Sequence, residues 1–319
     1  EDCRRQRQMC IRDRYFMAIS FEGKVCVITG AGNGLGKSHA LALASRGAKV
    51  VVNDLGGARD GTGASSEAAD AVVDEIHKLG GEAFAHGANV TNFDEVQAMI
   101  DQTMKKWGRV DVLINNAGIL RDKSFSKMEL DDFKLVIDVH LMGSVNCTKA
   151  VWEIMKEQNY GRIVMTTSSS GLYGNFGQTN YGAAKMGLIG LMNTLVLEGG
   201  KYNIHVNALS PTANTRMTED LIPPPMLELM TAESVTAGAL VLCHEKSPNR
   251  TILCCGAGGY AKATIYETDG IFVSKDEQSP EMVIYNWEEL VNPENQKALD
   301  SGGKQTEKFL MKAMAALQK

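Results

Sequence analysis

The sequence predicts an α/β fold in which one doubly wound parallel sheet carries helices on both faces. Short apolar runs rich in Val and Ile recur along the chain, and stretches with helical apolar spacing separate them. The runs are apolar throughout rather than alternating, which is typical of strands buried on both faces. This strand–helix alternation favours right-handed crossovers and a Rossmann-type sheet that binds ligands at the carboxyl ends of its strands. No repeat or linker divides the chain, so we expect a single domain.

The elements can be placed in chain order from these patterns. The strand segments are short and β-branched; they are expected at Lys24–Thr29, Ala48–Asn53, Ala83–Ala88, Val110–Asn115, Arg162–Thr167 and Ile204–Leu209. The helical segments are longer and amphipathic; they are expected at Gly36–Arg46, Ser66–Leu79, Phe93–Lys106, Leu130–Gln158, Tyr181–Lys201, Ala232–Glu245 and Thr306–Leu317. Two connections are long: a Gly-rich loop at 55–65, and a loop with a short helix at 211–231, where a substrate lid would fall.

Composition excludes several classes of protein. The 319 residues are 44% hydrophobic and 22% charged, which fits an ordinary soluble globular protein. The net charge of −5 argues against wholesale binding of nucleic acid or of anionic membranes. No apolar run approaches the roughly 18–20 residues of a membrane span, so membrane insertion is not expected.

The first 16 residues differ from the rest. They carry five Arg against three acidic residues, a net +2, which leaves −7 on the other 303 residues. No apolar stretch of a signal peptide follows, and Met17 opens a segment that resembles a natural start. We expect 1–16 to be a non-native or disordered extension, with a basic arm as the alternative. Residues 17–255 then form the core, and 256–319 form an extension packed on the same domain or on a partner subunit.

The seven cysteines form no recognisable site. No two are spaced C-x-x-C, so neither a zinc site nor a thioredoxin-type motif is indicated, and no metal is expected. Buried, reduced thiols in a reducing compartment are the simpler interpretation.

A glycine-rich turn follows the first expected strand and opens the first helix. Gly30, Gly34 and Gly36 are spaced G-x-x-x-G-x-G, with Asn33 and Leu35 between them. Such a turn brings backbone N–H groups and a helix N-terminus against a pyrophosphate. The pattern therefore predicts a dinucleotide site.

Polar residues at three other strand ends extend this site. Asp54 ends the second strand, where a carboxylate accepts ribose hydroxyls of NAD and repels the 2′-phosphate of NADP; NAD is therefore favoured. After the third strand, Asn89 and Val90 are placed to touch the adenine. After the fourth, the cofactor neighbours are Asn116, Ala117 and Gly118, although an Asn there is as well explained by tying backbone turns together.

A Tyr-x-x-x-Lys pair predicts proton-transfer chemistry. Tyr181 and Lys185 share one helix face, and Ser168 lies at the end of the preceding strand. Free tyrosine has a pKa of about 10, and a nearby ammonium stabilises the phenolate; a fall of about 3 in that pKa corresponds to about 4 kcal/mol. We expect Lys185 to supply this field and to bind the nicotinamide ribose, and Ser168 to hold the substrate oxygen.

These motifs in this order resemble the short-chain dehydrogenase/reductase superfamily over about residues 20–255. Several stretches resemble, more narrowly, the (3R)-hydroxyacyl-CoA dehydrogenase domain of the peroxisomal multifunctional β-oxidation enzymes. They are VVVNDLGG (50–57), NNAGILRDKSF (115–125), VHLMGS (139–144), YGNFGQTNYGAAK (173–185) and the GAGG–NW tail (256–287).

Two segments depart from the superfamily pattern. Most members carry a catalytic Asn on the helix after NNAG, where this chain has His140, as do the hydroxyacyl-CoA dehydrogenases it resembles. The resemblance leaves open whether His140 takes part in proton relay or only packs there. In 210–217, Thr215 is assigned to the nicotinamide carboxamide, and Arg216 with Arg121 is either a contact for coenzyme A phosphates or an ordinary pair of solvated side chains.

The resemblance implies NAD-dependent oxidation of a (3R)-3-hydroxyacyl-CoA to a 3-oxoacyl-CoA in fatty-acid β-oxidation, with Ser168, Tyr181, Lys185 and His140 as the catalytic set. Alternatives are a 3-oxoacyl-carrier-protein reductase, which Asp54 disfavours, and a steroid or polyol dehydrogenase. A silent nucleotide-binding scaffold is the non-enzyme alternative, which the intact Ser–Tyr–Lys set disfavours.

The resemblance also suggests partners. We expect a homodimer through the helices at 130–158 and 181–201. Hydratase and lipid-transfer domains follow the dehydrogenase in the multifunctional enzymes; none is found here, so a separate enoyl-CoA hydratase is expected. The final Leu-Gln-Lys differs from a Ser-Lys-Leu peroxisomal signal, which favours a free-standing cytoplasmic enzyme, bacterial in origin.

Overall fold

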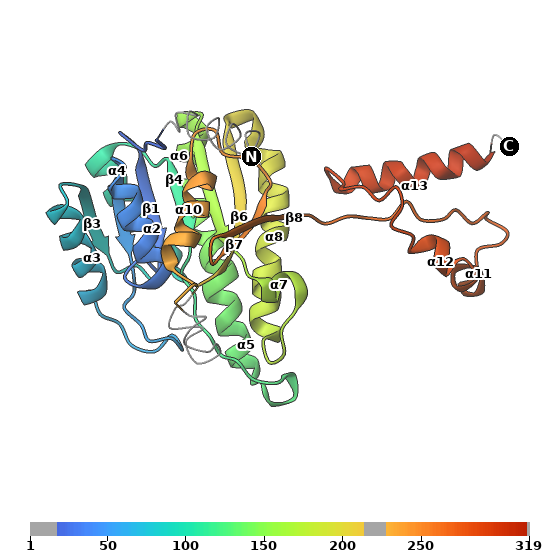
Figure 1. The fold of residues 1–319 in the computed structure, drawn as a ribbon, viewed down its shortest axis with the longest axis horizontal. Coiled ribbons are helices and arrows are strands. Elements are labelled where there is room, and N and C mark those ends of the chain that lie inside the picture. Colours follow the sequence, from blue (N-terminus) through green and yellow to red (C-terminus); the bar gives the residue numbers. More distant parts are fainter. Residues whose placement is uncertain (1–17, 214–227, 318–319) are drawn as a thin grey trace, which may run out of the picture. The chain divides into compact units, whose positions relative to one another are not determined.

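The computed structural model describes residues 18–213 and 228–317. The chain divides into two compact units, residues 1–261 and 262–319. The first unit contains an eight-stranded sheet with the order β3-β2-β1-β4-β5-β6-β7-β8 (Figure 1). The strand order reverses at β1, between β2 and β4, as in a doubly wound sheet. The predicted fold class is therefore confirmed. Within the described residues, no helix combines the length and the apolar character needed to cross a membrane.

All six expected strands form, and two more follow them. Every neighbouring pair from β3 to β7 is parallel. Ala257 and Gly258 both have positive φ in the two-residue turn after β7, the conformation of a tight hairpin. The strands are β1 (Val25–Thr29), β2 (Lys49–Asn53), β3 (Glu82–His86), β4 (Val112–Asn115), β5 (Gly161–Thr166), β6 (Ile204–Thr212), β7 (Ile252–Gly256) and β8 (Gly259–Ala263).

The helices cover both faces of the sheet. On one face α2 packs against α3 and α10, and on the other α4 packs against α6 (Figure 1). The helix predicted as continuous over 130–158 is divided by a π-helical turn, Asp138–Met142, so this prediction was wrong in detail. The bounds are α2 (Gly34–Ala44), α3 (Glu67–Lys78), α4 (Phe93–Trp107), α5 (Leu130–Ile137), α6 (Gly143–Gln158), α7 (Ser169–Tyr173), α8 (Thr179–Gly199) and α10 (Ala232–Cys243).

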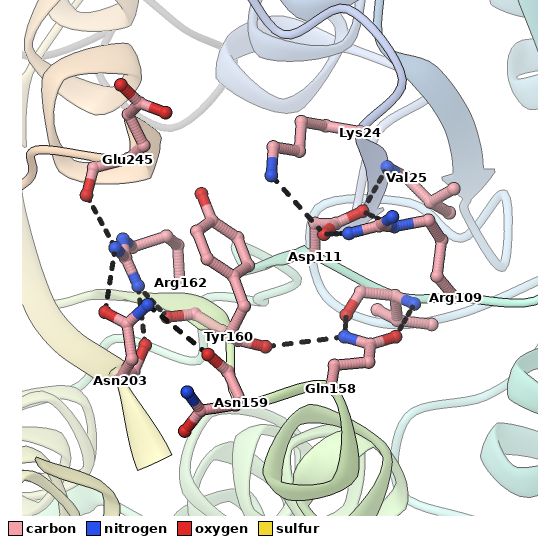
Figure 2. A network of polar contacts seen from close by, with 12 residues as sticks. Lys24, Val25, Arg109, Asp111, Gln158, Asn159, Tyr160, Arg162, Asn203 and Glu245 are labelled. Atoms are coloured by element: carbon pink, nitrogen blue, oxygen red, sulfur yellow. Dashed lines mark hydrogen bonds and ion pairs between the residues drawn. The ribbon is translucent and has the colours of Figure 1, made fainter. Parts of the chain in front are cut away.

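A buried arginine closes the amino end of β5 (Figure 2). The Arg162 side chain is 1% exposed, and its guanidinium donates to the carbonyl oxygens of Asn203 (2.7 Å), His244 (3.1 Å) and Glu245 (2.6 Å). The guanidinium carbon also lies 4.3 Å from the centre of the Tyr160 ring. Because a buried charge is tolerated only when its hydrogen bonds are satisfied, these contacts fix the loops that precede β6 and follow α10.

Asp111 has the matching role beside β4 (Figure 2). Its fully buried carboxylate accepts two hydrogen bonds from Arg109, at 2.7 and 2.6 Å, and one from the Val25 backbone N–H at 2.9 Å. Lys24 lies 3.8 Å away and adds a second positive charge. Together the two groups form a polar network at the amino ends of the strands.

His39 joins α2 to α10 and gives the fold a predictable response to pH. Its ring is fully buried, with Nδ1 2.7 Å from Thr236 Oγ1, and burial lowers the pKa of His39 from 6.5 to about 4. At neutral pH the ring is uncharged in both the folded and the unfolded chain, so it adds no pH dependence there. Below pH 6.5 the unfolded chain binds the proton first, and stability is lost until about pH 4.

We expect this loss to reach about 2 kcal/mol at pH 5, since each pH unit between the two pKa values corresponds to about 1.4 kcal/mol. Urea unfolding of the wild type and of His39→Gln at pH 7 and pH 5 measures it. Other titrating groups affect both proteins alike, so the wild type should lose about 2 kcal/mol more than the variant. Equal losses would contradict the prediction.

The second unit, by itself, is held by ion pairs rather than by a core. It contains α11 (Pro280–Tyr285), α12 (Trp287–Leu290) and α13 (Gly302–Leu317), so a helix does form over the predicted 306–317. Lys308 binds Glu267, and Lys312 lies 2.7 Å from Asp269, which fixes α13 to the segment before it. None of its described residues is buried.

Candidate active site

The carboxyl ends of β1, β2, β4, β5 and β6 open onto one cavity of about 480 Å³. Gly36, in the first turn of α2, is buried and is not among the lining residues. Thr215 and Arg216 lie outside the described residues, as does most of the expected lid. The structure brings together around the cavity the predicted residues Gly30, Asn33, Gly34, Leu35, Asp54, Asn89, Val90, Asn116, Ala117, Gly118, His140, Ser168, Tyr181 and Lys185.

The glycine turn has the geometry of an anion cradle. Gly30 and Gly34 have φ of +62° and +52°, which other residues rarely adopt. A Cβ at Gly36 would lie 2.1 Å from the Gly30 carbonyl oxygen, so the chain closes there only without a side chain. Asn33, the N-cap residue of α2, makes no side-chain capping bond, and the first N–H groups of that helix remain available at the cavity.

Asp54 is oriented by the backbone on both sides. Its Oδ2 accepts from the Gly32 N–H and its Oδ1 from the Gly56 N–H, each at 2.7 Å. A carboxylate has lone pairs beyond these two contacts, so it can accept further hydrogen bonds from a ligand in the cavity. The second contact comes from the predicted Gly-rich loop, which begins directly after Asp54.

Asn116 ties the glycine turn to β4. Its Nδ2 donates to the carbonyl oxygens of Thr29 and Gly30, both at 3.0 Å. The Thr29 hydroxyl in turn accepts from the N–H groups of Asn116 (2.9 Å) and Ala117 (3.0 Å). Both amide hydrogens of Asn116 are thus used, which supports the alternative in which this residue holds backbone turns together.

The part of the cavity wall that follows β3, where the sequence predicts an adenine contact, is similarly fixed. Asn89 Oδ1 accepts from the Thr91 N–H and hydroxyl, at 3.0 and 2.9 Å, and the Val90 carbonyl accepts from Asn146 Nδ2 at 2.9 Å. The Val90 side chain also faces Gly143, where a Cβ would approach it to 2.7 Å. These residues therefore form a rigid wall.

Ser168, Tyr181 and Lys185 converge from β5 and α8. Ser168 caps α7 by accepting from the Ser170 N–H at 3.2 Å, and its side chain lies beside the Tyr181 phenol. Lys185 lies one helical turn after Tyr181, with Nζ 5.4 Å from the centre of the phenol ring. That Nζ donates to the Thr166 carbonyl at 2.6 Å, so the cation is anchored at the end of β5.

The pKa values of this pair differ from the expectation. Burial raises the pKa of Tyr181 to about 12, the Ser168 hydroxyl opposes that rise, and the Asp122 carboxylate adds to it. Burial also lowers the pKa of Lys185 to about 7. The predicted lowering of the tyrosine pKa was wrong for this state, because loss of hydration outweighs the nearby ammonium. Forming the phenolate and the ammonium together costs less than forming either alone.

His140 lies in the π-helical turn and packs against Tyr181. The two rings meet edge to face, with centroids 5.1 Å apart. His140 Nε2 lies 2.8 Å from the Ile119 carbonyl oxygen and 3.1 Å from its N–H, while Nδ1 has no hydrogen-bond partner among the described residues. A Cβ on Gly118 would approach the imidazole to 2.3 Å, so this glycine makes room for the ring. Burial lowers the pKa of His140 well below its ordinary value, and the ring is neutral.

Several cavity residues were not predicted from the sequence, and three polar ones among them share one wall. Ser170, Asn175 and Gln178 lie on the wall beside Ser168 and Tyr181. They fall within the stretch YGNFGQTNYGAAK and just before it, so the resemblance was the only signal that could have drawn attention to them. Arg121, by contrast, pairs with Asp132 at 2.8 Å.

Comparison with known proteins identifies the family. A family model described as short chain dehydrogenase matches residues 24–224. "Peroxisomal multifunctional enzyme type 2" of Mus musculus is 48% identical over 283 residues, which are 87% of this chain but only 38% of that protein. A "Putative short-chain type dehydrogenase/reductase" of Mycobacterium tuberculosis is 48% identical over 272 residues, covering 85% of this chain and 95% of that protein.

Solved structures agree. The full-length peroxisomal multifunctional enzyme type 2 from Drosophila melanogaster superposes with a TM-score of 0.77 at 38% identity, covering 92% of this chain and 50% of that one. A 7α-hydroxysteroid dehydrogenase complexed with NADH superposes with a TM-score of 0.68 at 30% identity, covering 75% and 95%. The resemblance found in the sequence is confirmed, and the chain belongs to the short-chain dehydrogenase family, oxidoreductases that act on CH–OH groups.

Proposed function

We propose that the protein oxidises (3R)-3-hydroxyacyl-CoA to 3-oxoacyl-CoA with NAD in fatty-acid β-oxidation. The observation that carries the proposal is that Ser168, Tyr181 and Lys185 share one cavity with the glycine turn and Asp54. The names of the mouse enzyme and of the yeast "Peroxisomal hydratase-dehydrogenase-epimerase", 48% identical over 281 residues, support the substrate class. The chain spans 38% and 31% of those two proteins, and an enoyl-CoA hydratase activity would supply its substrate.

The cavity fits a nicotinamide dinucleotide. The bare glycine turn and the uncapped start of α2 would hold its pyrophosphate, Asp54 its adenosine ribose, and Lys185 its nicotinamide ribose. When bound, the nicotinamide ring accepts the hydride from C3 of the substrate. Asp54 favours NAD over NADP because a 2′-phosphate would meet its carboxylate. Thr215, assigned to the carboxamide, stays a prediction.

The residues of the chain then manage the proton. With the phenol proton transferred to Lys185, the Tyr181 phenolate accepts the proton of the substrate hydroxyl, and Ser168, which lies beside that phenol, holds the same oxygen in line. Lys185, itself buried, offsets the phenolate charge. His140 acts as a positioning residue: it braces the Tyr181 ring and fixes the Ile119 backbone opposite it.

A single assay tests the function. NAD and NADP reduction would be followed with (3R)- and (3S)-hydroxyacyl-CoAs of several chain lengths. We expect turnover of the R enantiomers, with NAD preferred. If none of these thioesters is oxidised, the proposed substrate class is wrong while the family assignment stands.

One alternative substrate has support from the comparisons. A "3-oxoacyl-[acyl-carrier-protein] reductase" of Synechocystis is 48% identical over 208 residues, or 65% of this chain. Such a reductase would act on the same acyl group attached to a carrier protein instead of to coenzyme A. The same assay, run in reverse with both carriers, decides between them.

Assembly and location are also proposed. A homodimer through α5, α6, α8 and the π-helical turn between α5 and α6 would cover exposed apolar side chains on these elements, namely Leu130, Met142, Met186 and Leu197. The cytoplasmic location expected from the sequence stays a prediction. The names of the relatives favour the peroxisome instead.

A further inference from the structure

A chain of hydrogen bonds runs along the wall of the cavity beside Ser168. Gln178 Nε2 donates to Asp122 Oδ2 at 2.7 Å. On its other side, Gln178 Oε1 accepts from Ser170 Oγ at 2.8 Å and from Asn175 Nδ2 at 3.1 Å. Because a carboxylate can only accept, Asp122 fixes which end of the Gln178 amide faces Ser170 and Asn175.

The backbone around this chain is rigid. Gln178 ends the loop between α7 and α8, and its side chain and backbone together are only 9% exposed. Gly177, with φ of +80°, accepts through its carbonyl oxygen from the Lys123 N–H at 3.0 Å. Asn180 Nδ2 donates to the Arg121 carbonyl at 3.0 Å. The loop is thus joined to the segment at 121–123 at several points, and its amides are held in place.

Both amides keep hydrogen-bonding capacity for a ligand. Each nitrogen, Asn175 Nδ2 and Gln178 Nε2, uses one of its two hydrogens in the contacts above; among the described residues neither has a second acceptor. Ser170, which donates to Gln178, offers the cavity lone pairs only. The two amides therefore supply side-chain N–H donors on this wall.

A 3-hydroxyacyl thioester carries a second oxygen that needs such donors. Ser168 and Tyr181 engage the oxygen on C3, and the thioester carbonyl lies two carbons away, at C1. Ser170 links the two places, since its N–H binds Ser168 and its hydroxyl binds Gln178. We propose, resting on the function proposed above, that Asn175 and Gln178 bind the thioester carbonyl oxygen and so select β-hydroxy thioesters over alcohols without a carbonyl at that position.

The test compares two ligands that differ only at C1. One is a (3R)-3-hydroxybutyryl thioester of coenzyme A, and the other is its thioether analogue, in which CH₂ replaces the carbonyl. Binding of each to the NAD-loaded enzyme is measured by competition, so that turnover of the analogue is not required. Gln178→Met keeps the side-chain length and removes the amide. We expect it to weaken thioester binding about tenfold and to change thioether binding less than about twofold.

Two further variants sharpen the result. Asp122→Asn removes the charge that orients Gln178; since Asp122 is exposed, the fold should be retained, and thioester binding should weaken in the same direction. Gln97→Met is the matched control, because Gln97 also donates to a carboxylate, Asp101 at 2.8 Å, but on the outer surface of α4. Gln97→Met should change the binding of neither ligand. Since the carbonyl is held in the ground state as well, the loss in Gln178→Met should appear in KM rather than kcat.

Each outcome is decisive. Equal weakening of both ligands by Gln178→Met would show that the amide only supports the loop, and no weakening of either would show that it touches no carbonyl; both results overturn the subsite. If the wild type oxidises 3-hydroxyacyl-CoA and the variants bind the thioester as tightly as the wild type, the subsite alone is wrong. If the wild type neither binds nor oxidises the thioester, the proposed function is wrong as well.

Discussion

Replacing Tyr181 by Phe should lower the rate of alcohol oxidation by about 10²–10⁴-fold, the usual contribution of a positioned acid or base. The change removes one oxygen atom and leaves a ring of the same shape against His140. The deficit should therefore appear in kcat, with little change in the affinity for NAD. Initial rates of NAD reduction with a hydroxyacyl-CoA that the wild type oxidises, together with a direct titration of NAD binding, measure both quantities.

Tyr202→Phe provides the matched control. Tyr202 ends the short 3₁₀ helix η3 (Gly200–Tyr202), away from the residues that line the cavity, and Lys156 lies over its ring. The control should retain wild-type kcat. Activity of Tyr181→Phe within a few-fold of the wild type would exclude the phenol as the base.

Replacing Gly36 by Ala should abolish dinucleotide binding and destabilise the fold. The new Cβ would lie 2.1 Å from the Gly30 carbonyl oxygen and 2.7 Å from Asn116 Nδ2. The carbonyl belongs to the backbone, so it cannot move away without distorting the turn. We expect a loss of a few kcal/mol in the free energy of unfolding, in the range of overpacked sites. Calorimetric titration with NAD and urea unfolding measure the two effects.

Gly200→Ala distinguishes this clash from the general effect of replacing a glycine. Gly200 has φ of −54°, and a Cβ there would meet nothing within 4 Å. This control should be neutral or slightly stabilising, since alanine restricts the unfolded chain more than glycine. If Gly36→Ala binds NAD like the control, the glycine turn does not form the cofactor cradle.

Much of the fold followed from the apolar runs, and its exceptions have physical reasons. The strands were predictable because a strand buried on both faces must be apolar throughout, as in β1, where all five residues are buried. β8 escaped prediction because its sequence, GYAKA, is polar or small and largely exposed. The π-helical turn at Asp138–Met142 gave no signal either, since such a turn needs no proline or glycine.

The sequence predicted which residues form the site better than it predicted their pKa values. The spacing of Tyr181 and Lys185 placed both side chains on one face of α8, but the direction of their pKa shifts depends on how deeply both are buried. Sequence spacing carries no information on that depth. The amide pair at 175 and 178 was missed for a related reason: its donor pattern arises from Asp122, more than fifty residues earlier in the chain.

The polar network of Asp111 and Arg162 separates what stabilises the fold from what performs the chemistry (Figure 2). It lies at the amino ends of β4 and β5, whereas Asn116, directly after β4, and Thr166, at the carboxyl end of β5, line the cavity. Substitutions at the carboxyl edge that alter substrate preference can therefore accumulate while the contacts at the amino edge, which stabilise the fold, stay intact. A library directed at the cavity loops should yield a high fraction of folded proteins, which makes this scaffold evolvable.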